Sequence, residues 1–520
     1  MPVDNPCCEL HRSPDWATSR AFLVTYRPSP PVSIKRNSIY NLGGGIAAMA
    51  IMLVAVPLYL DLIGQARFGV LSLVWLLSGY FGSFDFGIGR ATAYVLARPQ
   101  TSPDTGNPAA QIFWTALSLS AAFGLIGGLL TFWLAPLLFL QVFNTPLPLA
   151  GEVLASLPWI AAGIPLLTIE SALTGTLTGR EKFRALNIRS VLASALTQFL
   201  PLLAVWQIAP SLDVAIPATI LARALALALF VFLAMQAVGA DWRPSPLGRR
   251  SQIRELLRFA GWVTLNRSLA QLIVSLDRFL IAALLTPIAL VQYSVPFQLV
   301  SRGAMVSSAL SSALFPRMAR LEPAQLREIA IRAMRANGAL MLVLCAGGII
   351  ILPLFLEIWI DREFSAKAAI VGQLIGCSLW LNAVALIPHN LLEAQGTPQQ
   401  IFKVGIVQLV PYVVLAGYGA TQIGVTGVAL AHILRTLVDL LMLARRAGLL
   451  EETLRIIGWP LALLVGCILL PTLAESQIWI SLSLQAFLLA GAGALAYHLF
   501  PEARELIAKQ IGAFKNRDAL

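Results

Sequence analysis

Long apolar runs follow one another along almost the whole chain, and each is close to the length that an α-helix needs to cross a bilayer, about 20 residues. The runs do not alternate polar with apolar positions, so they predict helices rather than the strands of a barrel. The pattern therefore predicts an all-α polytopic membrane protein with about 14 transmembrane helices. We place them at residues 38–60, 69–89, 111–135, 151–174, 188–208, 213–237, 259–283, 288–315, 336–358, 368–391, 404–420, 424–444, 456–473 and 478–499.

The two ends of the chain are more polar than the middle. Residues 1–34 are rich in proline and have no apolar run long enough for a signal peptide, so we expect a disordered cytoplasmic tail there. Residues 501–520 are predicted to form a second cytoplasmic tail.

Short stretches of the first half of the chain recur in the second half. Gly69–Ser72 aligns with Val291–Ser294, and Leu221–Arg223 aligns with Leu430–His432. Repeats of this kind are typical of transporters, and six helices in each repeat would relate the two by an axis along the membrane normal. The predicted organisation is an N-lobe at 35–240, a cytoplasmic linker at 241–258, a C-lobe at 259–446 and two extra helices at 447–500.

Composition supports the membrane assignment. Hydrophobic residues make up 58% of the chain and charged residues only 12%, whereas soluble domains carry about 25% charged residues. This excludes a soluble enzyme and a nucleic-acid-binding protein.

The net charge of +11 follows from topology. With the N-terminus inside, 29 of the 37 Lys and Arg residues fall in predicted cytoplasmic segments, three in outside loops and five within spans. This bias predicts that both termini are cytoplasmic. Attraction to anionic membrane lipids accounts for the basic loops without any nucleic acid partner.

The segments that connect the predicted helices are too short to form a soluble catalytic domain. No loop between predicted helices exceeds about 22 residues, and the five cysteines lack the spacing of metal ligands. We therefore expect no enzyme activity, no cofactor and no metal site. The short loops also argue against a membrane-embedded enzyme that acts on lipid-linked sugars.

Two regions carry a family resemblance. Pro57–Leu60 and Ile63–Leu73 resemble the first hairpin of the polysaccharide transporter (Wzx-like) flippases, within the multidrug/oligosaccharidyl-lipid/polysaccharide exporter superfamily. Leu276–Ile281, Tyr293–Ser294 and Phe315–Pro316 are similar to the family's seventh and eighth helices.

The resemblance implies a V-shaped, MATE-like pair of lobes that works by alternating access in the bacterial inner membrane. Its implied substrate is a polyprenyl-pyrophosphate-linked oligosaccharide for O-antigen, capsule or exopolysaccharide assembly. Glycosyltransferases and a polysaccharide polymerase would be its partners. The alternatives are a cation-coupled multidrug or small-molecule exporter and a lipid II flippase, which also has two extra helices.

Four arginines within the spans are candidates for substrate binding, because a charge at membrane depth is costly and is usually functional. They are Arg223, Arg267, Arg278 and Arg302. A guanidinium stays protonated and binds phosphate oxygens in pairs, so we predict a cationic cavity for the pyrophosphate. The alternative is that each arginine pairs with a carboxylate, as Arg278 would with Asp277, or reaches an interface.

Other ionisable residues are candidates for coupling to an H⁺ or Na⁺ gradient. His432, Arg435 and Asp439 share one helical face, which suits a relay, although Arg435 and Asp439 could equally form a neutral pair. Asp85 could bind a coupling ion or pair with Arg90.

Overall fold

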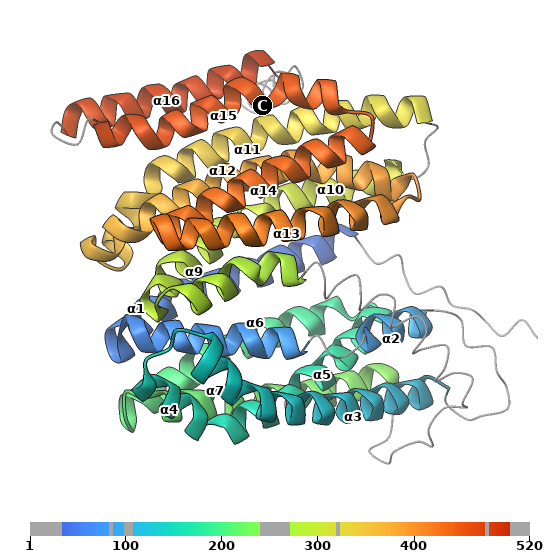
Figure 1. The fold of residues 1–520 in the computed structure, drawn as a ribbon. Coiled ribbons are helices and arrows are strands. Elements are labelled where there is room, and N and C mark those ends of the chain that lie inside the picture. Colours follow the sequence, from blue (N-terminus) through green and yellow to red (C-terminus); the bar gives the residue numbers. More distant parts are fainter. Residues whose placement is uncertain are drawn as a thin grey trace, which may run out of the picture.

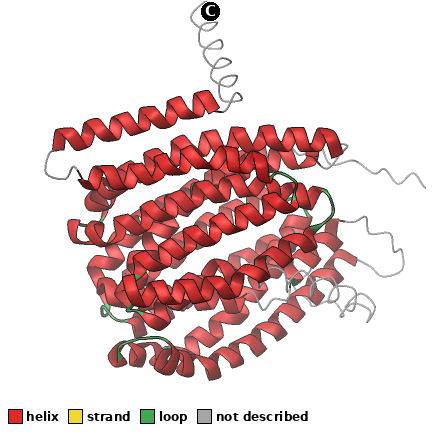
Figure 2. Ribbon diagram, turned by 45° about the horizontal axis from the view of Figure 1, so that its top comes forward, coloured by secondary structure: helices red, strands yellow, loops and turns green. Residues whose placement is uncertain are grey.

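The computed structural model describes residues 34–82, 87–97, 108–239, 271–318, 323–473 and 478–499. Within these segments the regular structure is entirely helical, which confirms the predicted fold class (Figure 2). Residues 271–284 are helical, and the other helices are α1 (Ile34–Gly82), α2 (Ile88–Ala97), α3 (Pro108–Leu137), η3 (Leu138–Val142), α4 (Leu147–Ala155), α5 (Leu157–Gly179), α6 (Phe183–Gln207), α7 (Leu212–Val238), α9 (Pro287–Ser301), α10 (Ala304–Met318), α11 (Pro323–Trp359), α12 (Arg362–Ala394), α13 (Pro398–Ile423), α14 (Val425–Arg446), α15 (Leu450–Leu473) and α16 (Ile478–Leu499).

Ten of the described helices are long and apolar enough to cross a membrane. The chain is therefore a multi-pass membrane protein, while the count of fourteen spans remains a prediction. One of the ten candidates, Gly43–Tyr80, combines two predicted spans.

The combined candidate is interrupted at Gly64, where φ is 77° and ψ is 164°. A positive φ with extended ψ is open only to glycine at low cost, so Gly64 allows the chain to turn between the two predicted spans. Beyond the turn, the Arg67 guanidinium forms an ion pair with Glu152 of α4 at 2.8 Å. The other Glu152 oxygen accepts a hydrogen bond from the backbone N–H of Leu212, which begins α7.

The helices form two halves (Figure 1). We call α1–α7 the N half and residues 271–499 the C half. In Figure 1, α2–α5 and α7 lie at the bottom, α10–α16 lie at the top, and α1, α6 and α9 lie between them. The α1 helix packs against both α6 and α9, so it links the halves.

One hydrophobic cluster crosses from one half to the other. It includes Phe68 and Phe139 of the N half together with Val291, Leu356 and Phe364 of the C half. We call the end of the bundle that holds this cluster the joined end.

At the opposite end the buried apolar side chains of the described residues fall into separate clusters. Those of the C half surround Trp380 and Leu440, whereas those of the N half surround Phe113 and Phe230. Among the described residues, the buried hydrophobic cluster that includes both halves is thus the one at the joined end.

In the described segments two hydrogen bonds also link the halves. The backbone N–H of Asn144 donates to the Ala282 carbonyl at 2.9 Å. The indole Nε1 of Trp359 in α11 donates to the carbonyl of Leu53 in α1 at 2.6 Å. The α1 helix contains Pro57 one turn after Leu53.

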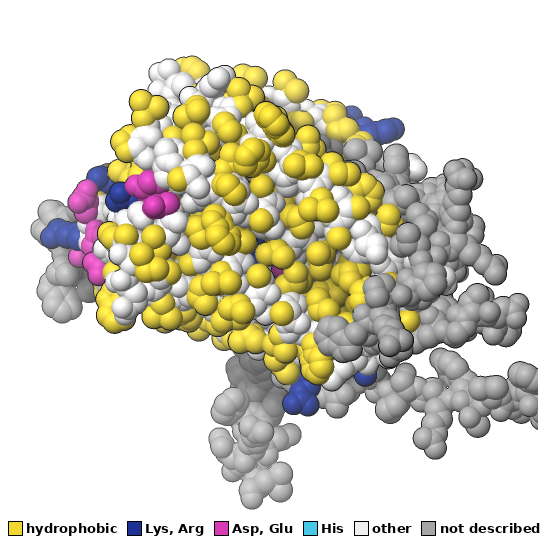
Figure 3. All heavy atoms as spheres, turned by 90° about the horizontal axis from the view of Figure 1, so that it is seen from below, with side chains coloured by type: hydrophobic (Ala, Val, Ile, Leu, Met, Phe, Trp, Pro, Cys, Tyr) yellow, Lys and Arg dark blue, Asp and Glu magenta, His cyan; other side chains and the backbone are white. Residues whose placement is uncertain are grey.

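The outer surface suits a bilayer. Figure 3 shows a face covered with hydrophobic side chains, with charged groups gathered mainly at its left edge. Large apolar side chains such as Trp133 of α3 and Val410 of α13 are more than two-thirds exposed. A surface this apolar is stable in lipid rather than in water.

The last two helices, α15 and α16, pack against α11, and α15 is further fixed by a 2.8 Å ion pair between Glu452 and Arg335. The boundaries that we predicted for the lobes stay predictions, because residues 240–270 lie outside the described part of the chain.

Candidate functional site

A group of buried polar side chains lies inside the C half. We call it the C-half polar cluster: Asp277, Arg278, Tyr293, Tyr412 and His432. The Asp277 side chain is fully buried. The hydroxyl of Tyr293 in α9 donates to its Oδ2 at 2.5 Å, and its Oδ1 accepts the backbone N–H of Arg278 at 2.8 Å.

His432 of α14 approaches the same carboxylate. Its Nδ1 lies 3.7 Å from Asp277 Oδ2, which is too long for a hydrogen bond. Neither this nitrogen nor the nearby hydroxyl of Tyr412 in α13 has a hydrogen-bond partner among the described residues. Buried polar groups usually have partners, so a cluster with two unsatisfied groups beside a carboxylate is a candidate binding site.

Aromatic rings separate the charges of this cluster. The Arg278 guanidinium lies 4.1 Å from the centre of the Phe297 ring, and Phe297 stacks on Tyr293 and meets His432 edge-on. The alternative considered for Arg278, an ion pair with the Asp277 side chain, does not form. Asp277 points instead toward Tyr293 and His432, which come from other helices.

The Arg435–Asp439 pair, one of the two alternatives for these residues, does not form in the structure. The Arg435 guanidinium lies over the Tyr412 ring at 5.3 Å, and Asp439 accepts a hydrogen bond from Gln408 of α13 at 2.6 Å. His432, Arg435 and Asp439 do share one side of α14 as predicted from their spacing. Their side chains contact different partners, however, and no hydrogen bond in the described residues joins one to the next.

Arg302 lies where the predicted eighth helix is broken. Residues 302–303 form a turn between α9 and α10, with hydrogen bonds from Arg302 N to Leu299 O and from Gly303 N to Val300 O. Such a tight turn within a helix often marks a functional position. The Arg302 side chain is half-buried.

The N half holds a second basic group. Arg189 of α6 forms an ion pair with Glu170 of α5, and its guanidinium lies 4.6 Å from the Phe230 ring centre. Arg223 of α7 is close enough to repel Arg189 electrostatically. Arg189 is therefore paired with a carboxylate, whereas Arg223 has no ion pair among the described residues.

Four intramembrane arginines share one property. Within the described segments none of them forms an ion pair with a carboxylate, contrary to the alternative that each is neutralised by pairing. They are Arg223, Arg278, Arg302 and Arg435. Arg278 lies over Phe297 and Arg435 over Tyr412, two rings that both lie beside His432, but the structure gives no contact that joins Arg302 or Arg223 to this group. The candidates Arg267 and Asp85 lie outside the described residues.

Sequence reasoning did not identify Tyr293, Tyr412 or Gln408 as site residues. Each lies in an apolar helix, where an isolated polar group is a usable signal because it needs a partner. No three potential metal ligands come together in the described segments.

Comparison with known proteins places the chain in a family. The profile of the family described as "Polysaccharide biosynthesis protein" matches residues 62–366, more than half of the chain. The chain belongs to this polysaccharide biosynthesis family. The matched region includes the interruption at Gly64, the C-half polar residues up to Tyr293, and Arg302.

Other similarities support the family's fold. The chain is 24% identical over 421 residues to a Shigella flexneri protein named "Putative O-antigen transporter", covering 79% of this chain and 97% of that protein. The structure of the lipid II flippase MurJ in an inward closed conformation matches with a TM-score of 0.66 and 13% identity, over 91% of this chain and all of MurJ.

An inward-facing multidrug resistance MATE family transporter of the MOP superfamily matches with a TM-score of 0.61 and 16% identity, over 81% of this chain and 94% of that one. This member of the polysaccharide biosynthesis family thus has the MATE/MurJ-like fold of the MOP superfamily. Its relatives are transporters rather than enzymes.

Proposed function

We propose that the protein is a flippase that moves polyprenyl-pyrophosphate-linked oligosaccharide repeat units across the bacterial cytoplasmic membrane. It would supply O-antigen, capsule or exopolysaccharide assembly, with glycosyltransferases before it and a polymerase after it. The observation that carries this proposal is the set of intramembrane arginines without an ion pair in the described segments, Arg223, Arg278, Arg302 and Arg435. An unpaired buried cation favours an anionic ligand, because only a counter-charge offsets its desolvation.

The proposed mechanism is alternating access between the two halves. Orientation follows from the positive-inside bias, which puts the N-terminus in the cytoplasm. The joined end then faces the periplasm, and substrate enters from the cytoplasmic side. The hydrophobic cluster that crosses the halves at the joined end supports this assignment.

The C-half polar cluster is the proposed site of energy coupling. Asp277 is a fully buried carboxylate, and 3.7 Å away lies an imidazole nitrogen without a hydrogen-bond partner in the described residues. Uptake of H⁺ or Na⁺ there would neutralise the carboxylate and change the contacts between residues 271–284, α9 and α14. This feature also favours the second candidate function, a cation-coupled exporter of small molecules.

The test replaces Arg302 by Ala and by Lys. We expect Arg302→Ala to lower the transport of lipid-linked oligosaccharide into proteoliposomes by at least about tenfold, and Arg302→Lys to restore part of it, because a charge-assisted contact is lost in the first and kept in the second. Imposed H⁺ and Na⁺ gradients in the same liposomes identify the coupling ion.

The matched control is Arg332→Ala, an exposed arginine of α11 whose ion pair is with Glu328 on the same helix. It should transport normally. Full transport by Arg302→Ala at equal protein levels would contradict the anionic site. Export of cationic drugs without movement of the lipid-linked sugar would favour the second candidate.

A further inference from the structure

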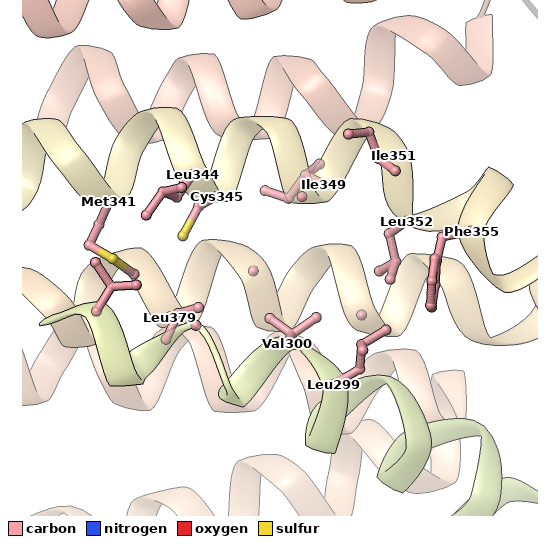
Figure 4. Close-up of a pocket in the computed structure, with 15 residues that line it drawn as sticks. Leu299, Val300, Met341, Leu344, Cys345, Ile349, Ile351, Leu352, Phe355 and Leu379 are labelled. Carbon is pink, nitrogen blue, oxygen red and sulfur yellow. The ribbon is translucent and has the colours of Figure 1, made fainter. Parts of the chain in front are cut away.

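An apolar cavity of about 380 Å³ lies between the α9–α10 segment, α11 and α12 (Figure 4). Its size is within the range of small-ligand sites. Every residue that lines it is apolar or glycine, among them Leu299 of α9, Leu344 and Phe355 of α11, and Leu379 of α12.

Hydrogen bonds of polar side chains fix the walls of this cavity relative to one another. Asn337 of α11 hydrogen-bonds Ser307 of α10 and donates to the Ala383 carbonyl of α12 at 2.7 Å. Farther along the same helices, Gln373 donates to the carbonyl of Ile349 at 3.0 Å. These bonds fix the spacing of α10, α11 and α12, so the cavity is a built feature rather than loose packing.

An empty apolar cavity lowers stability in proportion to its volume, so an occupant is favoured. The cavity is not enclosed, because its lining residues Val306, Leu344 and Ile351 are among the exposed apolar side chains, the last two on α11, which is long and apolar enough to cross the membrane. A hydrocarbon chain can therefore enter from the membrane without crossing water.

Charge at the edge of the cavity narrows the identity of the occupant. Arg302 does not itself line the cavity, but along the chain it lies in the α9–α10 turn between the lining residues Val300 and Gly303, and no carboxylate among the described residues pairs with it. An amphiphile with its phosphate at Arg302 would place the first units of its chain in the cavity. One glycine of the lining, Gly348 of α11, has nothing within 4 Å of the position of a Cβ and so leaves room for a branched chain.

We propose that this cavity binds the pyrophosphate-proximal part of the isoprenoid chain of the substrate, with the pyrophosphate held at Arg302. The inference rests on the proposed function and deepens it. It separates a site for the lipid from the site for the sugars, and it explains how one transporter could accept a constant lipid while the sugars vary.

The test uses a farnesyl pyrophosphate that carries a photoreactive diazirine in its last isoprene unit, applied to the purified full-length protein in nanodiscs. We expect adducts, located by mass spectrometry, within residues 341–355 and 372–379. Unlabelled farnesyl pyrophosphate should compete for them, whereas phosphatidylglycerol should not.

Matched variants make the test specific. Gly348→Leu fills the cavity, because nothing lies within 4 Å of a Cβ at this position, and it should lower the adduct yield about tenfold. Gly458→Leu has equally open surroundings on α15 and does not line the cavity, so it should leave the yield unchanged.

Several outcomes would overturn the inference: adducts confined to other helices, equal competition by phosphatidylglycerol, or full labelling of Gly348→Leu. Saturable probe binding with adducts elsewhere would refute the cavity alone and leave the proposed function standing. Cavity adducts in a protein that moves no lipid-linked oligosaccharide would refute the proposed function and leave an isoprenoid site.

Discussion

At the scale of single residues, the stability of the C half depends on how Asp277 is satisfied. Its carboxylate is fully buried and is hydrogen-bonded by the Tyr293 hydroxyl. Removing one partner of a buried polar group costs more than the bond itself contributes, because the remaining group stays desolvated.

We therefore predict that Tyr293→Phe lowers the free energy of unfolding by about 1–3 kcal/mol, measured by denaturant titration in detergent. Tyr412→Phe is the control, since its buried hydroxyl has no partner in the described structure, and it should be neutral or stabilising. In an Asp277→Asn background the effect of Tyr293→Phe should shrink, as a double-mutant cycle would show. Equal losses for both tyrosines would contradict this interpretation.

Sequence reasoning could find the buried charges but not their partners. Arg302 and Arg278 are conspicuous because each interrupts an apolar run. The side-chain contacts of Asp277, in contrast, come from positions 16 and more than 150 residues away along the chain, and the adjacent Arg278 contributes only its backbone N–H. These contacts depend on how α9, α13 and α14 pack together, and the periodicity of each helix does not predict that packing.

At the scale of elements, Gly64 determines how the first two spans are connected. Its backbone angles, φ 77° and ψ 164°, lie in a region that is strained for any residue with a side chain.

Gly64→Ala should lower the free energy of unfolding by about 1–3 kcal/mol, measured by thermal or denaturant unfolding. Gly151→Ala in α4 is the matched control, because an added Cβ there has open space and lies in a regular helix. This control should be neutral or raise stability by about 0.5–1 kcal/mol. Equal effects would show that the backbone at Gly64 is not constrained.

Hydropathy predicted helices well and helix breaks poorly. The predicted span at 288–315 corresponds to two helices, α9 and α10, separated at Arg302 and Gly303. A break without proline leaves the apolar run intact, so hydropathy could not reveal it. The turn at Gly64, by comparison, falls in the polar gap that the sequence already placed between two spans.

At the scale of the whole molecule, the two halves must part at the joined end during the proposed cycle. The hydrogen bond between Asn144 N and Ala282 O brings their backbones within disulfide range. In a variant lacking the native cysteines, Asn144→Cys with Ala282→Cys should cross-link and stop transport, and dithiothreitol should restore it.

The control pair is Ser378→Cys with Thr436→Cys, whose native hydroxyl oxygens lie 2.9 Å apart within the C half. This cross-link should leave transport intact, because both residues move together. Unchanged transport by the oxidised Asn144–Ala282 pair would show that the joined end does not open.

The internal repeat predicted a two-lobe transporter, and the fold is MATE/MurJ-like. The orientation predicted from the charge bias stays a prediction. The sequence could not show which end of the bundle is joined. Conformations joined at either end bury the same helices and differ only slightly in packing. The hydropathy pattern of the sequence therefore does not distinguish them.

The hydrogen bond between Trp359 and Leu53 shows how a single proline in the sequence can favour the conformation in which the halves are joined. Pro57 has no N–H, so the carbonyl four residues earlier, that of Leu53, lacks its helical donor. The indole of the opposite half supplies a donor in its place at 2.6 Å. When the halves separate at this point, the Leu53 carbonyl, which lies within the membrane, needs another hydrogen-bond donor or stays unsatisfied. The missing hydrogen bond within one helix thus stabilises the conformation in which the two halves are in contact.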